Sequence, residues 1–326
     1  MSYTLNFSLL LCLRLELNGE WILITALAGG VGAARFLTGL KHVIKDEISV
    51  IVNTGDDIEL YGLHISPDLD IITYTLSERV NEDKGWGIRD DTFHFLNALK
   101  DYGSDTWFCL GDKDLATHFY RTELLRQGFS LSQITNEICD SLGVKVKVLP
   151  MTNDKFETRI ITPEGEMHFE EYFVKRQFKD KVLGVRFIGS KTAEPAPGVL
   201  DAILEAEKIV VCPSNPIVSI GTILSVNQIR ESLNRTKAKV VAVSPIVAGA
   251  PIKGPADKML QAAGIEVSAY GVAKLYSDFL DEIIIDNKDE AEKERIEKLG
   301  INVTVTNTIM KTFEDKVLLA KAVLEI

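Results

Sequence analysis

The sequence predicts an α/β protein with a doubly wound, mostly parallel sheet that carries an inserted α+β subdomain. Short, β-branched apolar runs such as Ile48–Val52 alternate with helical patterns in the first and last parts of the chain, as strands buried on both faces do. Between them, residues 145–188 alternate apolar and polar side chains around turn residues, which is typical of antiparallel hairpins. Polar loops follow several strand-like runs, where open α/β sheets bind ligands.

The first part of the chain has a β-α-β pattern, and helices follow it. The predicted elements are a strand at Ile22–Ala28, a helix at Ala33–Ile44, a strand at Ile48–Val52, a helix at Thr92–Lys100 and a short strand at Thr106–Leu110. Residues 115–142 form one or two amphipathic helices, the second beginning at the N-cap Ser130 and ending at Gly143.

The middle of the chain predicts the inserted subdomain, and the β-α pattern then returns. Candidate hairpin strands are Lys145–Leu149, Glu157–Thr162, Met167–Val174 and Val182–Ile188, and later strands are Ile209–Cys212, Val240–Val243, Ile283–Ile285 and Val303–Val305. We therefore expect a nucleotide-binding core from 21–114 and 195–326, an inserted subdomain at 115–194, and a dispensable extension at 1–20.

The composition argues against some classes of function and predicts a cellular location. The 326 residues carry a formal net charge of −11, which argues against generic binding to nucleic acid or to an anionic membrane. Four scattered cysteines without zinc spacing predict reduced thiols and a cytoplasmic location. The apolar run Phe7–Leu13 is too short to span a bilayer, and a signal peptide is a less favoured alternative to a dispensable extension.

The segment Val52–Asp70 (VNTGDDIELYGLHISPDLD) places four carboxylates directly after a buried strand. One or two of them are expected to cap helices or fill turns. Four acids this close would repel one another without a cation, and carboxylate oxygens are the ligands that Mg²⁺ prefers. The candidate Mg²⁺ ligands are Asp56, Asp57, Asp68 and Asp70.

Two further loops are candidates for nucleotide binding. Gly29, Gly30 and Gly32 separate a strand from a helix, so that backbone amides and the helix N-terminus could approach a phosphate, or the loop could be only a tight turn. The residue at the third position of the dinucleotide fingerprint is Arg35, which disfavours a dehydrogenase, and there is no P-loop. The rigid turn Pro213-Ser214-Asn215-Pro216 follows another strand and suits a base and ribose.

Other polar and aromatic residues have both structural and functional interpretations. Trp86 lies between two glycines and could stack on a planar ring, or serve only as packing in a lid. Asp114 could be an N-cap and His118 a satisfied helix residue, whereas Lys113 and Arg121 could neutralise phosphate. No Ser/His/Asp or Cys/His arrangement is evident, which favours direct transfer over a covalent intermediate.

Seven motifs in order resemble the 2-phospho-L-lactate transferase family of coenzyme F-420 biosynthesis, and the bacterial branch in particular. They are AGGVGAARFLTGL, NTGDD, ISPDLD, GWGIRDDTF, GDKDLATHFYR, CPSNPIVSIGTIL and VSPIVAGAPIKGPADK, and they run almost from Ile22 to the C-terminus. The resemblance implies a Rossmann-like, Mg²⁺-dependent enzyme. It would transfer a phospholactyl or phosphoenolpyruvyl group from a guanosine diphosphate-linked donor to the ribityl hydroxyl of the deazaflavin FO, and GMP would leave.

The resemblance also implies roles for individual residues. Asp57 and Asp70 would be catalytic, and FO would contact Asp70, Trp86 and Arg89. Position 109, basic in many members, is a cysteine here, so the FO contact at Cys109 departs from the family pattern, and Arg89 or the backbone would substitute for it. The nucleotide and its phosphates would be held by Gly29, Gly30, Gly32, Arg35, Asn53, Ser214, Asn215 and Ser219.

Two further expectations concern the oligomeric state and a competing function. An acidic α/β enzyme of this size is expected to form a homodimer. The competing interpretation is a non-catalytic regulator that binds nucleotide-sugars, from a related gluconeogenesis-factor family with the same fold. The segments Gly85-Trp86-Gly87 and SPDLD favour the transferase.

Overall fold

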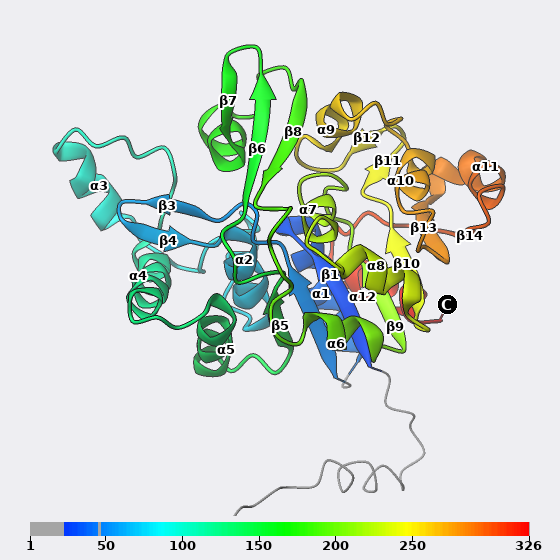
Figure 1. Cartoon of the computed structure of the whole chain (residues 1–326), viewed down its shortest axis with the longest axis horizontal. Helices are drawn as coiled ribbons and strands as arrows, with labels where there is room; N and C mark the ends of the chain where they lie inside the picture. The colour runs from blue at the N-terminus through cyan, green and yellow to red at the C-terminus, as the bar shows by residue number, and fades with distance from the viewer. Residues whose placement is uncertain (1–22, 45–46, 326) are drawn as a thin grey trace, which may run out of the picture.

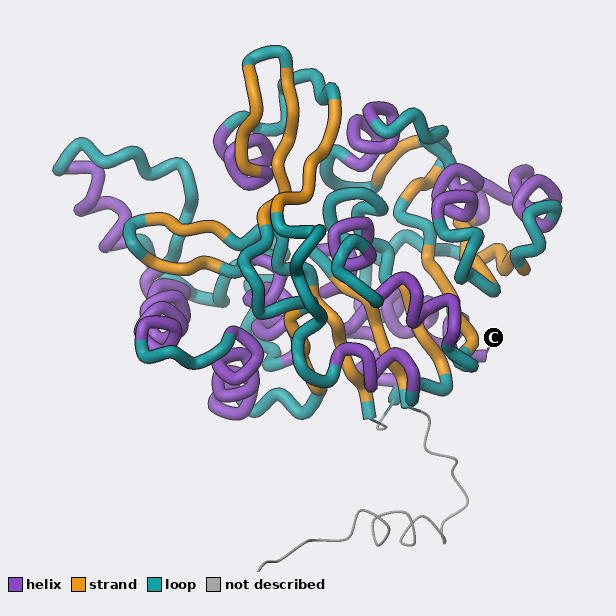
Figure 2. The backbone as a smooth tube through the Cα atoms, viewed as in Figure 1, coloured by secondary structure: helices purple, strands orange, loops and turns teal. Residues whose placement is uncertain are grey.

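A twisted parallel sheet of seven strands lies at the centre of the protein, with helices packed on both faces (Figure 1 and Figure 2). The computed structural model describes residues 23–44 and 47–325. Across the sheet the strands are β14 (Asn302–Thr306), β13 (Glu282–Asp286), β10 (Lys239–Val243), β9 (Lys208–Val211), β1 (Ile24–Ala28), β2 (Ile48–Val52) and β5 (Lys147–Pro150). All neighbouring pairs are parallel.

The two faces of the sheet bury separate hydrophobic clusters, because successive side chains of a strand point to opposite faces. In β1, Ala26 and Ala28 belong to one cluster and Leu27 to the other. The first cluster packs under α1 (Gly30–Val43), α2 (Pro67–Leu76), α5 (Leu131–Leu142) and α12 (Phe313–Glu325). The second packs under α6 (Val199–Leu204), α7 (Ile220–Leu224), α8 (Ile229–Arg235), α9 (Ala256–Ala262), α10 (Ala269–Leu275) and α11 (Lys293–Glu297), the last preceded by the 3₁₀-helix η2 (Asn287–Glu292).

Smaller elements extend beyond the carboxyl ends of the central strands. Two short ribbons are formed by β3 (Ile58–Leu60) with β4 (Leu63–Ile65) and by β11 (Ile246–Val247) with β12 (Ala250–Pro251). A separate antiparallel sheet contains β7 (Gly165–His168), β6 (Glu157–Thr162) and β8 (Gly184–Ile188), followed along the chain from β7 by the π-helix η1 (Glu171–Lys175). Helices α3 (His94–Asp101) and α4 (Asp112–Arg126) lie to the left of the sheet in Figure 1.

The structure confirms the predicted fold class and most of its elements. The helix predicted at Ala33–Ile44 is α1, and the four later strands are β9, β10, β13 and β14. Ser130 caps α5 through a capping box with Gln133, and Gly143 ends the helix in the left-handed conformation, as predicted. The predicted extension at 1–20 lies outside the described residues.

Three strand predictions are wrong. Thr106–Leu110 is a loop, whose apolar Phe108 and Cys109 line a cavity instead of entering the sheet. Lys145–Leu149 was expected in the antiparallel subdomain, but β5 pairs in parallel with β2 at the edge of the central sheet. The strand expected at Met167–Val174 ends at His168, where a helical turn begins. Alternation of apolar residues indicates a half-buried segment, but it does not specify the partner strand.

Two further expectations can be compared with the structure. Cys109, Cys139 and Cys212 are free thiols, whereas Cys12 lies outside the described residues. Across the part of the chain that the structure describes, every helix is too short or too polar to cross a membrane.

Candidate active site

The order of strands changes direction between β1 and β9. From β1 the chain proceeds outward to β2 and β5, and it then returns to β9, on the other side of β1, before β10, β13 and β14. The loops on either side of such a point diverge at the carboxyl ends of the strands and leave a crevice. A cavity of about 630 Å³ opens there, and residues that follow both β1 and β9 line it.

The glycine loop after β1 is joined to the turn after β9. The Gly29 amide donates to Ser214 Oγ (3.2 Å), and the Ser214 hydroxyl donates to the carbonyl oxygen of Gly29 (2.8 Å). Gly30 has φ +70°, and a Cβ at Gly32 would collide with the carbonyl of Pro213. Glycine is therefore required for the backbone conformation at one position and for the close approach of the two loops at the other.

The first turn of α1 faces the cavity through Val31 and Gly32, and no acid lies in that turn. The N-terminus of this 14-residue helix carries partial positive charge and unsatisfied amide donors. Asn215 and Ser219 line the same cavity. The structure therefore brings together the two motifs that the sequence assigns to nucleotide and phosphate binding.

Asn53 joins two of the predicted carboxylates below the glycine loop. Its Nδ2 donates to Asp56 Oδ2 (2.8 Å) and to Asp68 Oδ2 (2.9 Å), and the Gly30 amide donates to Asp68 Oδ1 (2.8 Å). All three side chains are buried, and Asn53 itself does not line the cavity. Burial raises the pKa of Asp68 to about 6, and burial together with the charge of Asp68 raises that of Asp56 well above its usual value.

Asp56 offers an oxygen that the protein itself does not satisfy. Its Oδ1 is buried without a hydrogen-bond partner, and Asp56 and Asp68 both line the cavity. Glu170, just before η1, faces the same space, and burial followed by the charges of Asp68 and Asp57 raises its pKa to about 8. Buried carboxylate oxygens without donors are suitable ligands for a hard divalent cation.

Asp57 lies next to these acids but makes different contacts. Its Oδ2 contacts His64 Nε2 (3.0 Å) and accepts from the Ser66 hydroxyl (2.8 Å), while its Oδ1 is buried without a partner. Asp57 does not line the cavity. The structure therefore separates Asp57 from the acids that face the cavity.

Asp70 belongs to a second network, which is centred on α4. Both of its carboxylate oxygens accept from the buried guanidinium of Arg121, Oδ2 at 3.1 Å from Nη1 and Oδ1 from Nη2. Burial lowers the pKa of Arg121, but the charge and hydrogen bonds of Asp70, together with the charges of Tyr74 and Asp57, raise it above its usual value. Asp70 therefore already has a cation bound to both oxygens, which makes it a poor ligand for Mg²⁺ in this arrangement.

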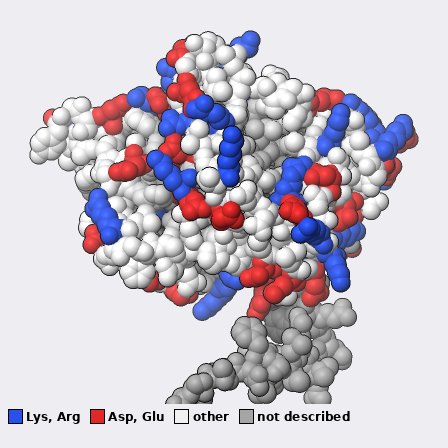
Figure 3. All heavy atoms as spheres, in the orientation of Figure 1, with Lys and Arg blue, Asp and Glu red and all other residues white. Residues whose placement is uncertain are grey.

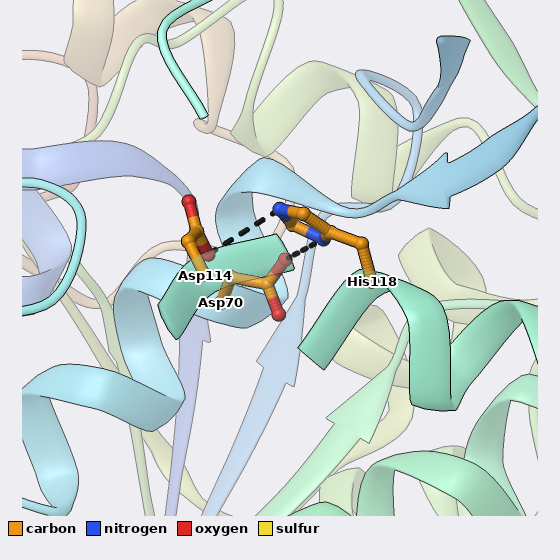
Figure 4. Close-up of side chains that lie close together, drawn as sticks. All are labelled: Asp70, Asp114 and His118. Atoms are coloured by element: carbon orange, nitrogen blue, oxygen red, sulfur yellow. Dashed lines mark ion pairs between the residues drawn. The ribbon is translucent and has the colours of Figure 1, made fainter. Parts of the chain in front are cut away.

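His118 links Asp70 to a second buried acid (Figure 4). Its Nδ1 lies 3.5 Å from Asp70 Oδ2, its Nε2 lies 3.3 Å from Asp114 Oδ1, and the Tyr74 hydroxyl donates to that same oxygen at 2.7 Å. Burial alone would raise the pKa of Asp114, but the contact and charge of His118 bring it below its usual value. Asp70, Asp114 and His118 form a compact set of metal-ligand types within the described residues, although Arg121 already occupies this network.

The sequence interpretation of α4 missed this network. The sequence suggests structural roles for Asp114 and His118 and a phosphate contact for Arg121. The available signal was their spacing at i, i+4 and i+7, which places all three on one face of a helix. That face points at Asp70, which is 51 residues away in sequence from Arg121.

Aromatic and apolar side chains line the rest of the cavity. Trp86 is 38% exposed, and the Lys84 ammonium lies 5.1 Å from the centroid of its ring. Phe108 lies in the loop before α4, and Phe169 stacks on Phe173 with ring centroids 5.5 Å apart and planes 9° apart. Such a lining suits a planar ring system.

The two remaining residues predicted to contact FO, Cys109 and Arg89, differ in their position relative to the cavity. Cys109 is exposed and lines the cavity. Arg89 does not line it, because its guanidinium is turned toward the backbone carbonyl of Glu78 (2.8 Å). Of Cys109 and its predicted substitute Arg89, only Cys109 is therefore positioned beside the cavity.

The charged side chains of the cavity form two sets, whereas positive and negative residues are mixed over the face shown in Figure 3. We call the first the acidic group, which contains Asp56, Asp68, Asp70, Asp114 and Glu170. We call the second the cationic group, which contains Arg35, Lys253 and Lys311. The acids Asp56, Asp68 and Asp70 lie in the segment after β2, whereas Lys253 and Lys311 lie in the segments after β10 and β14, two strands on the other side of β1.

The fold and this cavity define a Rossmann-like α/β protein with a site at the topological switch point. Residues 24–317 match the family described as 2-phospho-L-lactate transferase CofD, and the chain belongs to that transferase family.

The relatives that the chain matches cover nearly its whole length. A phosphoenolpyruvate transferase of Kitasatospora aureofaciens is 45% identical over 309 residues, which are 92% of this chain and 96% of that protein. A 2-phospho-L-lactate transferase of Methanocaldococcus jannaschii is 42% identical over 307 residues, 93% of this chain and 97% of that protein. A solved structure of a UPF0052 family protein from Bacillus halodurans shares the fold, with a TM-score of 0.64, 16% identity and coverage of 94% of this chain and 100% of that one.

Proposed function

We propose that the protein transfers a phospholactyl or phosphoenolpyruvyl group from a guanosine diphosphate-linked donor to the terminal ribityl hydroxyl of the deazaflavin FO. The hydroxyl oxygen forms a bond to the phosphorus that bears the three-carbon acid. The bond from that phosphorus to the GMP phosphate oxygen breaks, GMP leaves, and the hydroxyl proton is released. The product is a phosphodiester in coenzyme F-420 biosynthesis.

One observation carries this proposal: a single cavity holds both parts that such a transfer requires. The glycine loop, Ser214 and Asn215 line it where helix α1 begins. Asp70, Trp86 and Phe108 line the same cavity. The first set suits a nucleotide diphosphate and the second a planar acceptor with a hydroxyl, so in-line transfer needs mainly positioning and charge neutralisation.

Asp70 orients the acceptor in this proposal. Arg121 fixes the plane of its carboxylate by binding both oxygens, and His118 contacts it from a second direction. Such a carboxylate can accept a hydrogen bond from the ribityl hydroxyl as it attacks. Trp86 and Phe108 provide apolar surface for the deazaflavin ring.

The Mg²⁺ ion expected from the sequence fits one part of the acidic group. Asp56 and Asp68 face the cavity beside the glycine loop, and Asp56 Oδ1 is buried without a regular hydrogen bond, with the Thr158 hydroxyl near the carboxylate. These residues would hold the ion, whereas Asp70 is bound by Arg121 and Asp57 lies outside the cavity lining. Bound there, Mg²⁺ would neutralise charge on the diphosphate.

The experiment that tests the function is a titration of FO fluorescence with the purified protein, with and without GDP and Mg²⁺, followed by turnover with each of the two donors. Saturable FO binding that responds to GDP and Mg²⁺, and formation of GMP with one donor, are the expected results. Binding of nucleotide-sugars without FO binding would contradict the proposal and favour the regulator. A cytoplasmic location and a homodimer stay predictions.

A further inference from the structure

The cationic group lines the cavity without pairing with its acids. Within residues 23–44 and 47–325, the side chains of Arg35, Lys253 and Lys311 make no ion pair or hydrogen bond. After hydrogen bonds from Thr312, the charge of Lys311 helps to lower the pKa of Asp315, but the side chains of Lys311 and Asp315 form no ion pair. What distinguishes these three cations from unpaired lysines elsewhere on the surface is their common place beside the glycine loop and its cavity.

The acids of the cavity have other contacts. Asp68 accepts from the Gly30 amide and Asn53, Asp70 from Arg121, and Asp114 from the Tyr74 hydroxyl. Charges of opposite sign thus line one cavity without pairing across it. Positive charges that line one cavity repel one another, and a bound anion would relieve that repulsion.

The three side chains come from different segments that meet at the cavity. Arg35 lies one turn into α1, after the glycine loop, Lys253 lies between β12 and α9, and Lys311 lies between β14 and α12. Burial and then the charge of Arg35 lower the pKa of Lys253, which places these two cations within electrostatic reach of each other. Three segments that are distant in sequence thus place positive charges beside the same cavity.

We propose that Arg35, Lys253 and Lys311 form an oxyanion subsite of the cavity, which binds the anionic end of the donor beyond the glycine loop. This inference rests on the proposed function and deepens it, because Lys253 and Lys311 have no role in the sequence interpretation. The oxyanion is either the second phosphate of the diphosphate or the carboxylate of the three-carbon acid. Both are bound by the same charge-assisted hydrogen bonds.

The experiment compares the wild type with Lys253→Met and Lys311→Met. Lys237→Met is the matched control, because Lys237 is an exposed lysine just before the amino end of β10, whereas the cavity lies at the carboxyl ends of the strands. Calorimetric titrations with GDP, GMP and inorganic pyrophosphate are combined with the KM of the donor and of FO. Loss of one charged contact should weaken oxyanion binding roughly 10- to 100-fold, with melting temperature and FO binding unchanged.

The outcomes separate the two sources of the oxyanion. Weaker binding of GDP with unchanged binding of GMP assigns the subsite to the second phosphate. Unchanged binding of GDP with a raised KM of the donor assigns it to the carboxylate. Unchanged GDP, pyrophosphate and donor values in both variants overturn the subsite, even if the wild-type protein is an active transferase. Conversely, a wild type that binds pyrophosphate through these lysines but never binds FO would retain the subsite and refute the proposed function.

Discussion

The acidic and cationic groups line the same cavity, but their contacts differ. Asp68, Asp70 and Asp114 are buried and accept hydrogen bonds from Asn53, Arg121 and Tyr74, respectively. Arg35, Lys253 and Lys311 have no side-chain partner among the described residues. The contacts of these three acids form when the chain folds, whereas in our proposal the cationic group gains its partner from a ligand. Substitutions in the first should affect stability and turnover, and those in the second mainly binding.

The largest effect is expected at the centre of the acidic group. Asp70→Asn keeps the size of the side chain but removes the charge that orients the acceptor hydroxyl. Turnover should fall roughly 10²- to 10⁴-fold, which is the usual range for a group that assists proton transfer. Steady-state kinetics with FO and the donor measure this, and circular dichroism checks the fold. Asp140→Asn, at an exposed site on α5, is the control, and near-normal turnover of Asp70→Asn would remove Asp70 from the mechanism.

Arg121→Met tests how much the same network contributes to the stability of the fold. The substitution leaves the buried carboxylate of Asp70 without its cation, and breaking a buried pair costs about 3–5 kcal/mol of unfolding free energy. Lys253→Met, in contrast, should change stability by less than about 0.5 kcal/mol. Urea unfolding of both variants makes the comparison directly. Equal unfolding free energies for Arg121→Met and Lys253→Met would mean that the contacts of the acidic group do not stabilise the fold more than the cationic group does.

Trp86→Ala tests whether the aromatic lining serves the acceptor. Loss of ring stacking should weaken FO binding by about 1–3 kcal/mol, by analogy with base stacking on aromatic side chains. Binding of GDP should change much less, because the glycine loop and Ser214 lie elsewhere in the cavity. Fluorescence titration and calorimetry provide the two values. Equal losses for both ligands would indicate that Trp86 only packs the fold.

The smallest expected effect concerns the pH dependence of stability at Glu170. Burial raises its pKa from 4.5 to about 8, so the folded protein keeps a proton that the unfolded chain has released. Stability should therefore fall as the pH rises from about 4.5 to about 8. Glu170→Gln removes this loss and should raise the melting temperature by roughly 2–4 °C at pH 8.5 relative to the wild type. If the difference in melting temperature between Glu170→Gln and the wild type does not increase from pH 5 to pH 8.5, the raised pKa of Glu170 is contradicted.

Local sequence determined much of the framework. Apolar β-branched runs specify β2, β9 and β13, because strands buried on both faces require such residues. The glycine loop, the turn at Ser214 and the capping box at Ser130 follow from side-chain chemistry within a few residues. The switch point follows from the order of these elements, so the position of the cavity was also predictable.

Tertiary structure alone decided how the site residues are grouped. The sequence places Asp56, Asp57, Asp68 and Asp70 in one cluster, but folding assigns Asp56 and Asp68 to Asn53, and Asp70 to Arg121 on a distant helix. It also turns Arg89 away from the cavity and places β5 in the central sheet. Hydrophobic periodicity and motif spacing predict the local conformation of a segment and which of its faces is buried. The partner of each buried charge depends on which segments meet in three dimensions, because each charge needs a complementary group within hydrogen-bonding distance.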